Sequence, residues 1–129
     1  MLAFKRLLAL ASLAVASVSA VPVRRSNSGQ GTFFEVGVGA CGITNVDTDL
    51  VVAVSQQLFD TFPGAGANPN ANPICNKPIT AHFQGKSVSV KVTDRCAACA
   101  LNDLDFSPSA FSKLADQSAG RIAITWDFD

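Results

Sequence analysis

The sequence predicts a small, mainly β protein whose five or six strands close into a barrel, with one or two short helices. Short apolar runs, some with every second residue apolar, recur between turn-forming Gly, Pro and Asn residues. Only two segments carry the signals that start a helix. A closed barrel is expected because closure removes the exposed edges of a small sheet.

The chain of 129 residues predicts one domain, and we expect the mature chain to start after the first 25 residues. Two basic residues precede an apolar run over residues 7–18, and small residues follow it, which is typical of a secretory signal peptide over residues 1–20. The run is too short to span a membrane. Arg24 and Arg25 predict a pro-segment site at the end of residues 21–25; the alternative is an exposed basic pair at a frayed terminus.

Without residues 1–25, six Lys and Arg remain against ten Asp and Glu, a net charge of −4. Nucleic-acid binding is not expected, because phosphate binding needs concentrated positive charge. No second apolar segment predicts a membrane anchor. We therefore expect a secreted, extracellular monomer.

The four cysteines predict two disulfides, because an oxidising compartment favours pairing and a small core gains from reinforcement. Three pairings are possible. The closeness of Cys96 and Cys99 in sequence favours Cys96–Cys99 together with Cys41–Cys75. A redox motif is less expected because the pair follows a strand rather than starting a helix, and a zinc site would need a second close pair. No metal and no cofactor are expected.

The predicted domain covers residues 31–129, and a polar, Gly-rich segment precedes it. Residues 26–30 are interpreted as a flexible leader, and residues 31–36 as the first strand. Residues 50–54 predict a buried strand. A short helical turn over residues 56–59 follows a possible Ser cap.

The second half of the domain starts after a turn-rich loop over residues 63–73, which is either a wall of a binding groove or a surface excursion. Residues 78–83 and 86–93 predict two strands of a hairpin joined at Gln84-Gly85. A last strand is predicted over residues 121–126, where Trp126 is either a core residue or a platform for sugar stacking.

The segment between these strands carries the candidate chemistry. Asp94 is predicted at the end of the strand that begins near Lys86, and Asp105 in a short loop before a helix capped by Ser107. Paired carboxylates can act as acid and base on a glycosidic bond. Acidic residues at strand ends and before helices also serve as caps and loop anchors, so both interpretations stay open. The single histidine, His82, has no nucleophile motif beside it and is interpreted as a strand residue.

The motifs, taken together and in order, resemble those of fungal expansin-like proteins. The resemblance is greatest to the single-domain loosenin type within the rare-lipoprotein-A-like (RlpA-like) double-psi β-barrel superfamily, and it covers residues 31–128. The motifs are Gly31-Thr32-Phe33-Phe34, Gly39-Ala40-Cys41-Gly42 with Asn45, Ile74-Cys75 with Lys77, Val92-Thr93-Asp94-Arg95-Cys96, and Leu104-Asp105-Phe106-Ser107-Pro108-Ser109-Ala110-Phe111.

This resemblance implies a six-stranded double-psi β-barrel with an open groove that binds a cell-wall polysaccharide of the cellulose or chitin class. By motif, Thr32, Asp94 and Asp105 correspond to the groove residues of expansins. Asp105 resembles the proton donor shared with the family-45 glycoside hydrolases. Those hydrolases place a base near the end of the first strand, where this chain has Glu35.

The function expected from the resemblance is polysaccharide binding and loosening without efficient hydrolysis, with Asp105 and Asp94 as the catalytic candidates. One alternative is a weak family-45-like endoglucanase with Glu35 as base. Another is an inhibitor of papain-type cysteine proteases, which some small members of the superfamily resemble. A third, the riboflavin-aldehyde-forming enzymes, is disfavoured because the chain has no flavin or nucleotide signature.

Overall fold

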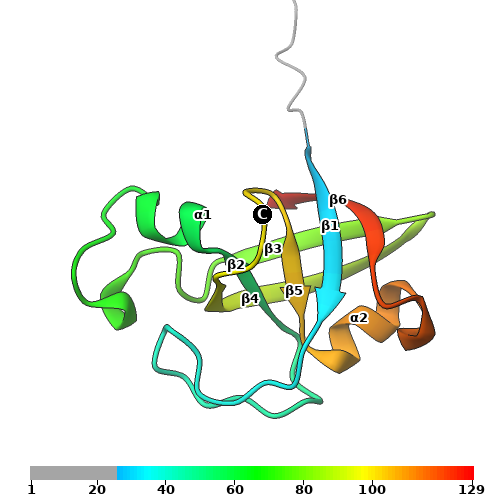
Figure 1. The fold of residues 1–129 in the computed structure, drawn as a ribbon, viewed down its shortest axis with the longest axis horizontal. Coiled ribbons are helices and arrows are strands. Elements are labelled where there is room, and N and C mark those ends of the chain that lie inside the picture. The colour runs from blue at the N-terminus through cyan, green and yellow to red at the C-terminus, as the bar shows by residue number, and fades with distance from the viewer. Residues whose placement is uncertain (1–25) are drawn as a thin grey trace, which may run out of the picture.

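The structure, a computed structural model, describes residues 26–129, so the predicted signal peptide (1–20) and pro-segment (21–25) lie outside the described residues. Six strands form a closed barrel in the order β1-β5-β2-β4-β3-β6 (Figure 1). This confirms the predicted mainly β barrel. The strands are β1 (Asn27–Phe33), β2 (Val51–Ser55), β3 (Pro78–Phe83), β4 (Lys86–Cys96), β5 (Leu104–Phe106) and β6 (Ile122–Phe128).

The barrel is mixed, because β1 pairs with β5 and β2 pairs with β4 in parallel, whereas the other neighbours are antiparallel. Two short α-helices, α1 (Gln56–Thr61) and α2 (Pro108–Leu114), lie outside the barrel on opposite sides of it (Figure 1). Single 3-10 turns occur at Pro69–Ala71 and Gln117–Ala119. None of the helices between residues 26 and 129 is long and apolar enough to cross a membrane.

Both helices begin where the sequence predicts. The Ser55 hydroxyl accepts a hydrogen bond from the Leu58 backbone N–H at 3.0 Å, and Ser107 caps α2 in the same way. At the β3–β4 hairpin, both Gln84 (φ 46°) and Gly85 (φ 80°) have positive φ. Two consecutive positive φ angles are what a tight hairpin turn requires.

The barrel interior is filled by branched aliphatic and aromatic side chains. Trp126 on β6 is 1% exposed, and its indole Nε1–H donates a hydrogen bond to the Asn102 carbonyl at 2.8 Å. Trp126 is therefore a core residue and not an exposed platform for sugar. The largest fully buried side chains are those of Trp126, Phe59, Phe106, Phe111, Ile74, Ile79, Leu104, Leu114, Val52, Val54, Val90 and Val92.

Strand β1 begins at Asn27, so the prediction of a flexible leader over residues 26–30 is wrong. This part of β1 pairs with β6 in antiparallel register. The exposed Ser28 and Gln30 belong to the outer face, and Gly29 and Gly31 take inward positions close to larger neighbours. A Cβ on Gly29 would lie 2.0 Å from the Asn102 carbonyl oxygen. Close packing therefore favours glycine at these positions. As a result, the segment lacks the alternation of apolar residues by which a strand is normally recognised in a sequence.

The two disulfides have the pairing favoured by the sequence. Cys41 is bonded to Cys75, with α-carbons 5.8 Å apart, and Cys96 to Cys99, with α-carbons 5.4 Å apart. The first joins the loop after β1 to the loop before β3. The second closes a short turn at the end of β4.

Candidate functional site

The candidate site is a row of side chains across four neighbouring strands. Thr32 of β1 pairs with Asp105 of β5, Asp105 pairs with Ala53 of β2, and Ala53 pairs with Asp94 of β4. Directly paired positions lie on the same face of a sheet. The two carboxylate residues are separated by two strand spacings, so their α-carbons are about 10 Å apart. The buried methyl group of Ala53 lies between them.

Asp94 belongs to this row because of an irregularity in β4. Val88, Val90 and Val92 alternate into the core, and strict alternation would direct Asp94 inward as well. The pairing of β2 with β4 shifts after Val92, so that Ala53 pairs with Asp94 and Thr93 is skipped. A β-bulge of this kind redirects the side chains that follow it. The bulge therefore places Asp94 on the face that carries Asp105.

Asp105 lies in the middle of β5 and not in a loop, which corrects the prediction for this residue. Its Oδ1 accepts a hydrogen bond from the Thr32 hydroxyl at 2.8 Å. Partial burial is the largest influence on this carboxyl and raises its pKa, and the charge of Asp94 raises it further. The Thr32 hydrogen bond and the charge of Arg121 lower the pKa, but the net direction is upward.

We expect Asp105→Asn to raise the thermal stability of the protein at pH 7. A raised pKa means that the fold disfavours the ionised carboxylate, so wild-type stability falls as the pH rises through that pKa. An amide oxygen can still accept the Thr32 hydrogen bond. The check is Tm of both proteins at several pH values. The gain should shrink as the pH falls toward 4, and a gain that is equal at all pH values would contradict the expectation.

Beside Asp105 there is a hollow of about 240 Å³, which is small compared with typical ligand pockets. The Cys96–Cys99 disulfide forms one wall and Phe33 another. Arg121 places a positive charge at the same hollow. Its lining residues are Thr32, Phe33, Cys96, Ala98, Cys99, Asp103, Asp105 and Arg121.

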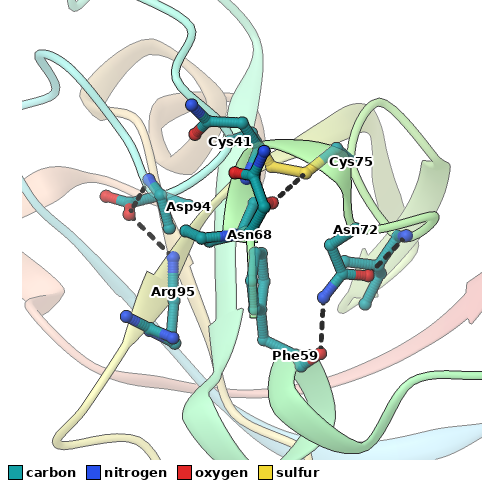
Figure 2. The surroundings of a disulfide bond; sticks show 11 residues. Cys41, Phe59, Asn68, Asn72, Cys75, Asp94 and Arg95 are labelled. Carbon is teal, nitrogen blue, oxygen red and sulfur yellow. Dashed lines mark hydrogen bonds between the residues drawn. A yellow bond between two sulfur atoms is a disulfide. The ribbon is translucent and has the colours of Figure 1, made fainter. Parts of the chain in front are cut away.

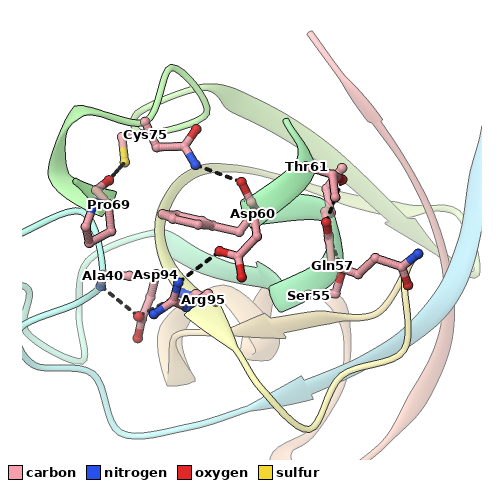
Figure 3. Close-up of polar contacts among 12 residues, drawn as sticks. Ala40, Ser55, Gln57, Asp60, Thr61, Pro69, Cys75, Asp94 and Arg95 are labelled. Atoms are coloured by element: carbon pink, nitrogen blue, oxygen red, sulfur yellow. Dashed lines mark hydrogen bonds and ion pairs between the residues drawn. The ribbon is translucent and has the colours of Figure 1, made fainter. Parts of the chain in front are cut away.

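Asp94 acts as an anchor for the chain around it. Its Oδ1 accepts hydrogen bonds from the backbone N–H of Ala40 at 2.8 Å and from that of Arg95 at 2.7 Å (Figure 3). The Arg95 guanidinium in turn forms an ion pair with Asp60 at 2.9 Å. Asp94 thus fixes the loop after β1 to the end of β4.

Glu35 is not brought together with the other three predicted site residues. It lies two residues beyond the end of β1, is exposed, and does not line the hollow beside Asp105. The structure therefore places Thr32 and Asp105 in direct contact, with Asp94 in the same row and Glu35 apart. Their roles in binding or catalysis stay predictions.

Neither Arg121 nor Asp103 was singled out for the site from the sequence. Asp103 holds the turn around the Cys96–Cys99 disulfide, because its Oδ1 accepts from the Gln30 N–H and its Oδ2 from the Ala100 N–H, both at 2.9 Å. Arg121 precedes β6 and reaches the hollow only because β6 closes the barrel against β1. No local pattern in the sequence marks either role.

A larger open hollow of about 760 Å³ lies on the outer face of β1, β3 and β6. His82 lines it, on β3 as predicted, together with neutral polar residues such as Gln30 and Thr125. None of its lining residues is Asp, Glu, Lys or Arg. The hollow beside Asp105 is therefore the better candidate for acid–base chemistry, although it is the smaller one.

Comparison with known proteins agrees with the fold. The double-psi β-barrel family model described as lytic transglycolase matches residues 51–126, which is more than half of the chain. The chain belongs to this double-psi β-barrel family. The match runs from β2 to β6 and includes Asp94 and Asp105.

Two proteins that are similar to this chain differ in what their names describe. The papain inhibitor of Streptomyces mobaraensis is 32% identical over 123 residues, which cover 91% of this chain and 82% of the inhibitor. The solved structure of Streptomyces papain inhibitor superposes with a TM-score of 0.73 at 30% identity, covering 83% of this chain and 96% of that one. A mutant expansin of Clavibacter michiganensis in complex with cellohexaose superposes with a TM-score of 0.66 at 24% identity, covering 81% of this chain and 50% of the expansin. The expansin likeness shows a shared fold.

Proposed function

We propose that this protein is an inhibitor of papain-type cysteine proteases. The observation that supports this most is the similarity to the Streptomyces papain inhibitor, which extends over most of both chains. The proposal replaces polysaccharide loosening, the main expectation from the sequence, with one of the alternatives. The likeness to expansin is lower in identity and spans only half of that protein.

The molecule has the physical properties that inhibition requires. A protease inhibitor must bind without unfolding and without becoming a substrate, so rigidity lowers the entropy lost on binding. Here a closed barrel carries the loops, and two disulfides tie the loop after β1 to the loop before β3 and close the turn at the end of β4. All four cysteines are paired, so the chain itself offers no thiol nucleophile.

We also infer that the protein is secreted, with the signal peptide (1–20) and pro-segment (21–25) removed. Two disulfides in so small a domain are typical of an oxidising compartment. The protein tested below therefore consists of residues 26–129.

The 26–129 protein is expected to inhibit papain with a Kd of about 1 μM or below, the range of specific protease–inhibitor contacts. The measurement is residual cleavage of a fluorogenic peptide by papain at increasing inhibitor concentration, with trypsin as the control protease. Asp105→Asn should inhibit as well as wild type. No inhibition of papain at about 100 μM, well above the expected Kd, would contradict the proposal.

Polysaccharide binding is the second candidate, and the row formed by Thr32, Asp105 and Asp94 favours it. The Thr32 hydroxyl and a free carboxylate oxygen on each Asp are suited to hydrogen-bonding sugar hydroxyls. Efficient hydrolysis is not proposed, because Glu35 does not line the hollow and the other carboxylate there, that of Asp103, accepts a backbone hydrogen bond on each of its oxygens. The finer assignment to loosenin-type proteins depends on this second candidate.

The same protein preparation, mixed with insoluble cellulose or chitin, separates the two candidates. Sedimentation with the polysaccharide, lost in Asp105→Asn, together with no effect on papain would favour the second candidate. Release of reducing sugar that vanishes in Asp105→Asn would instead support the weak endoglucanase alternative.

A further inference from the structure

The loop over residues 34–50, between β1 and β2, concentrates exposed apolar side chains. Four large apolar side chains are exposed among residues 26–129: Val38 (75%), Val46 (59%), Leu101 (44%) and Leu50 (41%). Three of the four belong to this loop. Single exposed apolar residues are common, whereas a group on one segment is typical of an interaction surface.

The backbone on both sides of Val38 is fixed by hydrogen bonds. Val38 forms an antiparallel bridge with Thr44. The Gly39 N–H donates to the Ile43 carbonyl at 3.1 Å, and the Gly37 carbonyl accepts from the Asn45 N–H at 3.0 Å. The most exposed apolar side chain in this group is thus held by an ordered backbone.

The middle of the loop is attached to the barrel. The Ala40 N–H donates to Asp94, the Cys41 N–H donates to the Thr93 carbonyl at 3.2 Å, and the disulfide of Cys41 ties the loop to Cys75 (Figure 2). Gly39 lies so close to β4 that a Cβ there would be 2.3 Å from the Thr93 carbonyl oxygen. Backbone and disulfide contacts therefore set the position of the loop.

The second exposed valine is held in a similar way. The Val46 N–H donates to Asp49 Oδ2 at 3.0 Å, and the Asp49 N–H donates back to the Val46 carbonyl at 2.9 Å. Asp47 accepts from the Val36 N–H at 3.0 Å across the loop. The backbone that carries both exposed valines is therefore already ordered before a partner binds.

We propose that the loop over residues 34–50 is the edge that enters the active-site cleft of a papain-type cysteine protease, with Val38 as its apolar anchor. This inference rests on the proposed function. An apolar side chain on a pre-ordered loop can be buried in a partner pocket with little loss of conformational entropy. The loop contains no Lys or Arg, so it lacks the basic side chain that the acidic specificity pocket of trypsin-like proteases selects.

The test compares three single variants of the 26–129 protein in the papain assay: Val38→Asp, Val46→Asp and the matched control Leu101→Asp. Leu101 is as exposed as Leu50 but lies near the Cys96–Cys99 turn. An anchor residue is worth at least about 2 kcal/mol, so Val38→Asp should raise the inhibition constant by at least about 30-fold. Val46→Asp should raise it by a smaller factor, and Leu101→Asp by less than about 3-fold.

Because Val38, Val46 and Leu101 are all exposed, the three variants should keep the wild-type circular dichroism spectrum and Tm. A folded Val38→Asp protein that inhibits like wild type would overturn the inference, and weakened inhibition by Leu101→Asp alone would place the inhibitory edge at the Cys96–Cys99 turn. Failure of wild type to inhibit papain would instead overturn the proposed function. A further variant, Gly39→Ala, should weaken inhibition while keeping Val38, because the added methyl must displace the loop.

Discussion

Replacing Trp126 with Ala is expected to lower the free energy of unfolding by about 3–5 kcal/mol, the cost of removing a large aromatic side chain from a core. Trp126 is 1% exposed and contacts Phe128 edge to face, with ring centroids 5.3 Å apart. Its Nε1–H also donates a hydrogen bond to the Asn102 carbonyl. Such a loss is a large part of the stability of a small domain.

The control is Trp126→Phe, which keeps an aromatic ring but removes the indole N–H. We expect a smaller loss of roughly 1–3 kcal/mol, because the Asn102 carbonyl loses its partner while most of the volume stays filled. Urea unfolding followed by circular dichroism measures both variants. Equal losses for the two variants would contradict this account of the core.

Removing the Cys41–Cys75 disulfide by Cys41→Ser with Cys75→Ser is expected to cost roughly 4 kcal/mol of unfolding free energy in the chain-entropy model. The bond closes a sequence separation of 34 residues. It also holds the loop over residues 34–50 against the barrel, so the double variant should lose inhibition of papain together with stability. Its Tm and inhibition constant provide the measurement.

The matched control is Cys96→Ser with Cys99→Ser. This bond spans a sequence separation of only 3, so its loss should cost roughly 2 kcal/mol. It should also leave the 34–50 loop in place. If the control variant were the less stable of the two, or lost inhibition to the same extent, the role assigned to Cys41–Cys75 would be wrong.

Much of the barrel could be predicted from local sequence. The alternation of Val88, Val90 and Val92, the Gln84-Gly85 turn and the two serine caps each reflect a local physical preference, and the structure contains all of them. The start of β1 could not be predicted, because two of its inward positions are glycines that lie against neighbours distant in sequence. A strand defined by close packing leaves no apolar alternation to detect.

The candidate site could be predicted only in part, because its residues are brought together by contacts between segments that are distant in sequence. Thr32 and Asp105 meet because parallel pairing joins residues 73 positions apart, which motif resemblance can indicate but local pattern cannot. Asp94 faces the same way only because of the bulge at Thr93. Glu35 was placed near the site by its position after the first strand, but it lies beyond the end of β1 and does not line the hollow.

The family match does not include the loop that we propose as the inhibitory edge. Asp94 and Asp105 lie within the region matched by the family model, which begins at residue 51. The loop over residues 34–50 lies outside that region. A match to the family therefore does not by itself identify an inhibitor, and the papain assays of the loop variants are the measurement that separates the two proposed functions.

The pairing of β1 affects how the chain must fold. Thr32 contacts a residue 73 positions later, and Ser26 contacts one 101 positions later, so β1 has no partner strand close to it in sequence. Non-local pairing of this kind slows folding to about milliseconds to seconds. Until β1 docks, the edges of β5 and β6 remain open to other chains. Aggregation during refolding should therefore depend on how rapidly the seven residues of β1 pair with β5 and β6, and early formation of the Cys41–Cys75 bond would keep β1 close to the rest of the barrel.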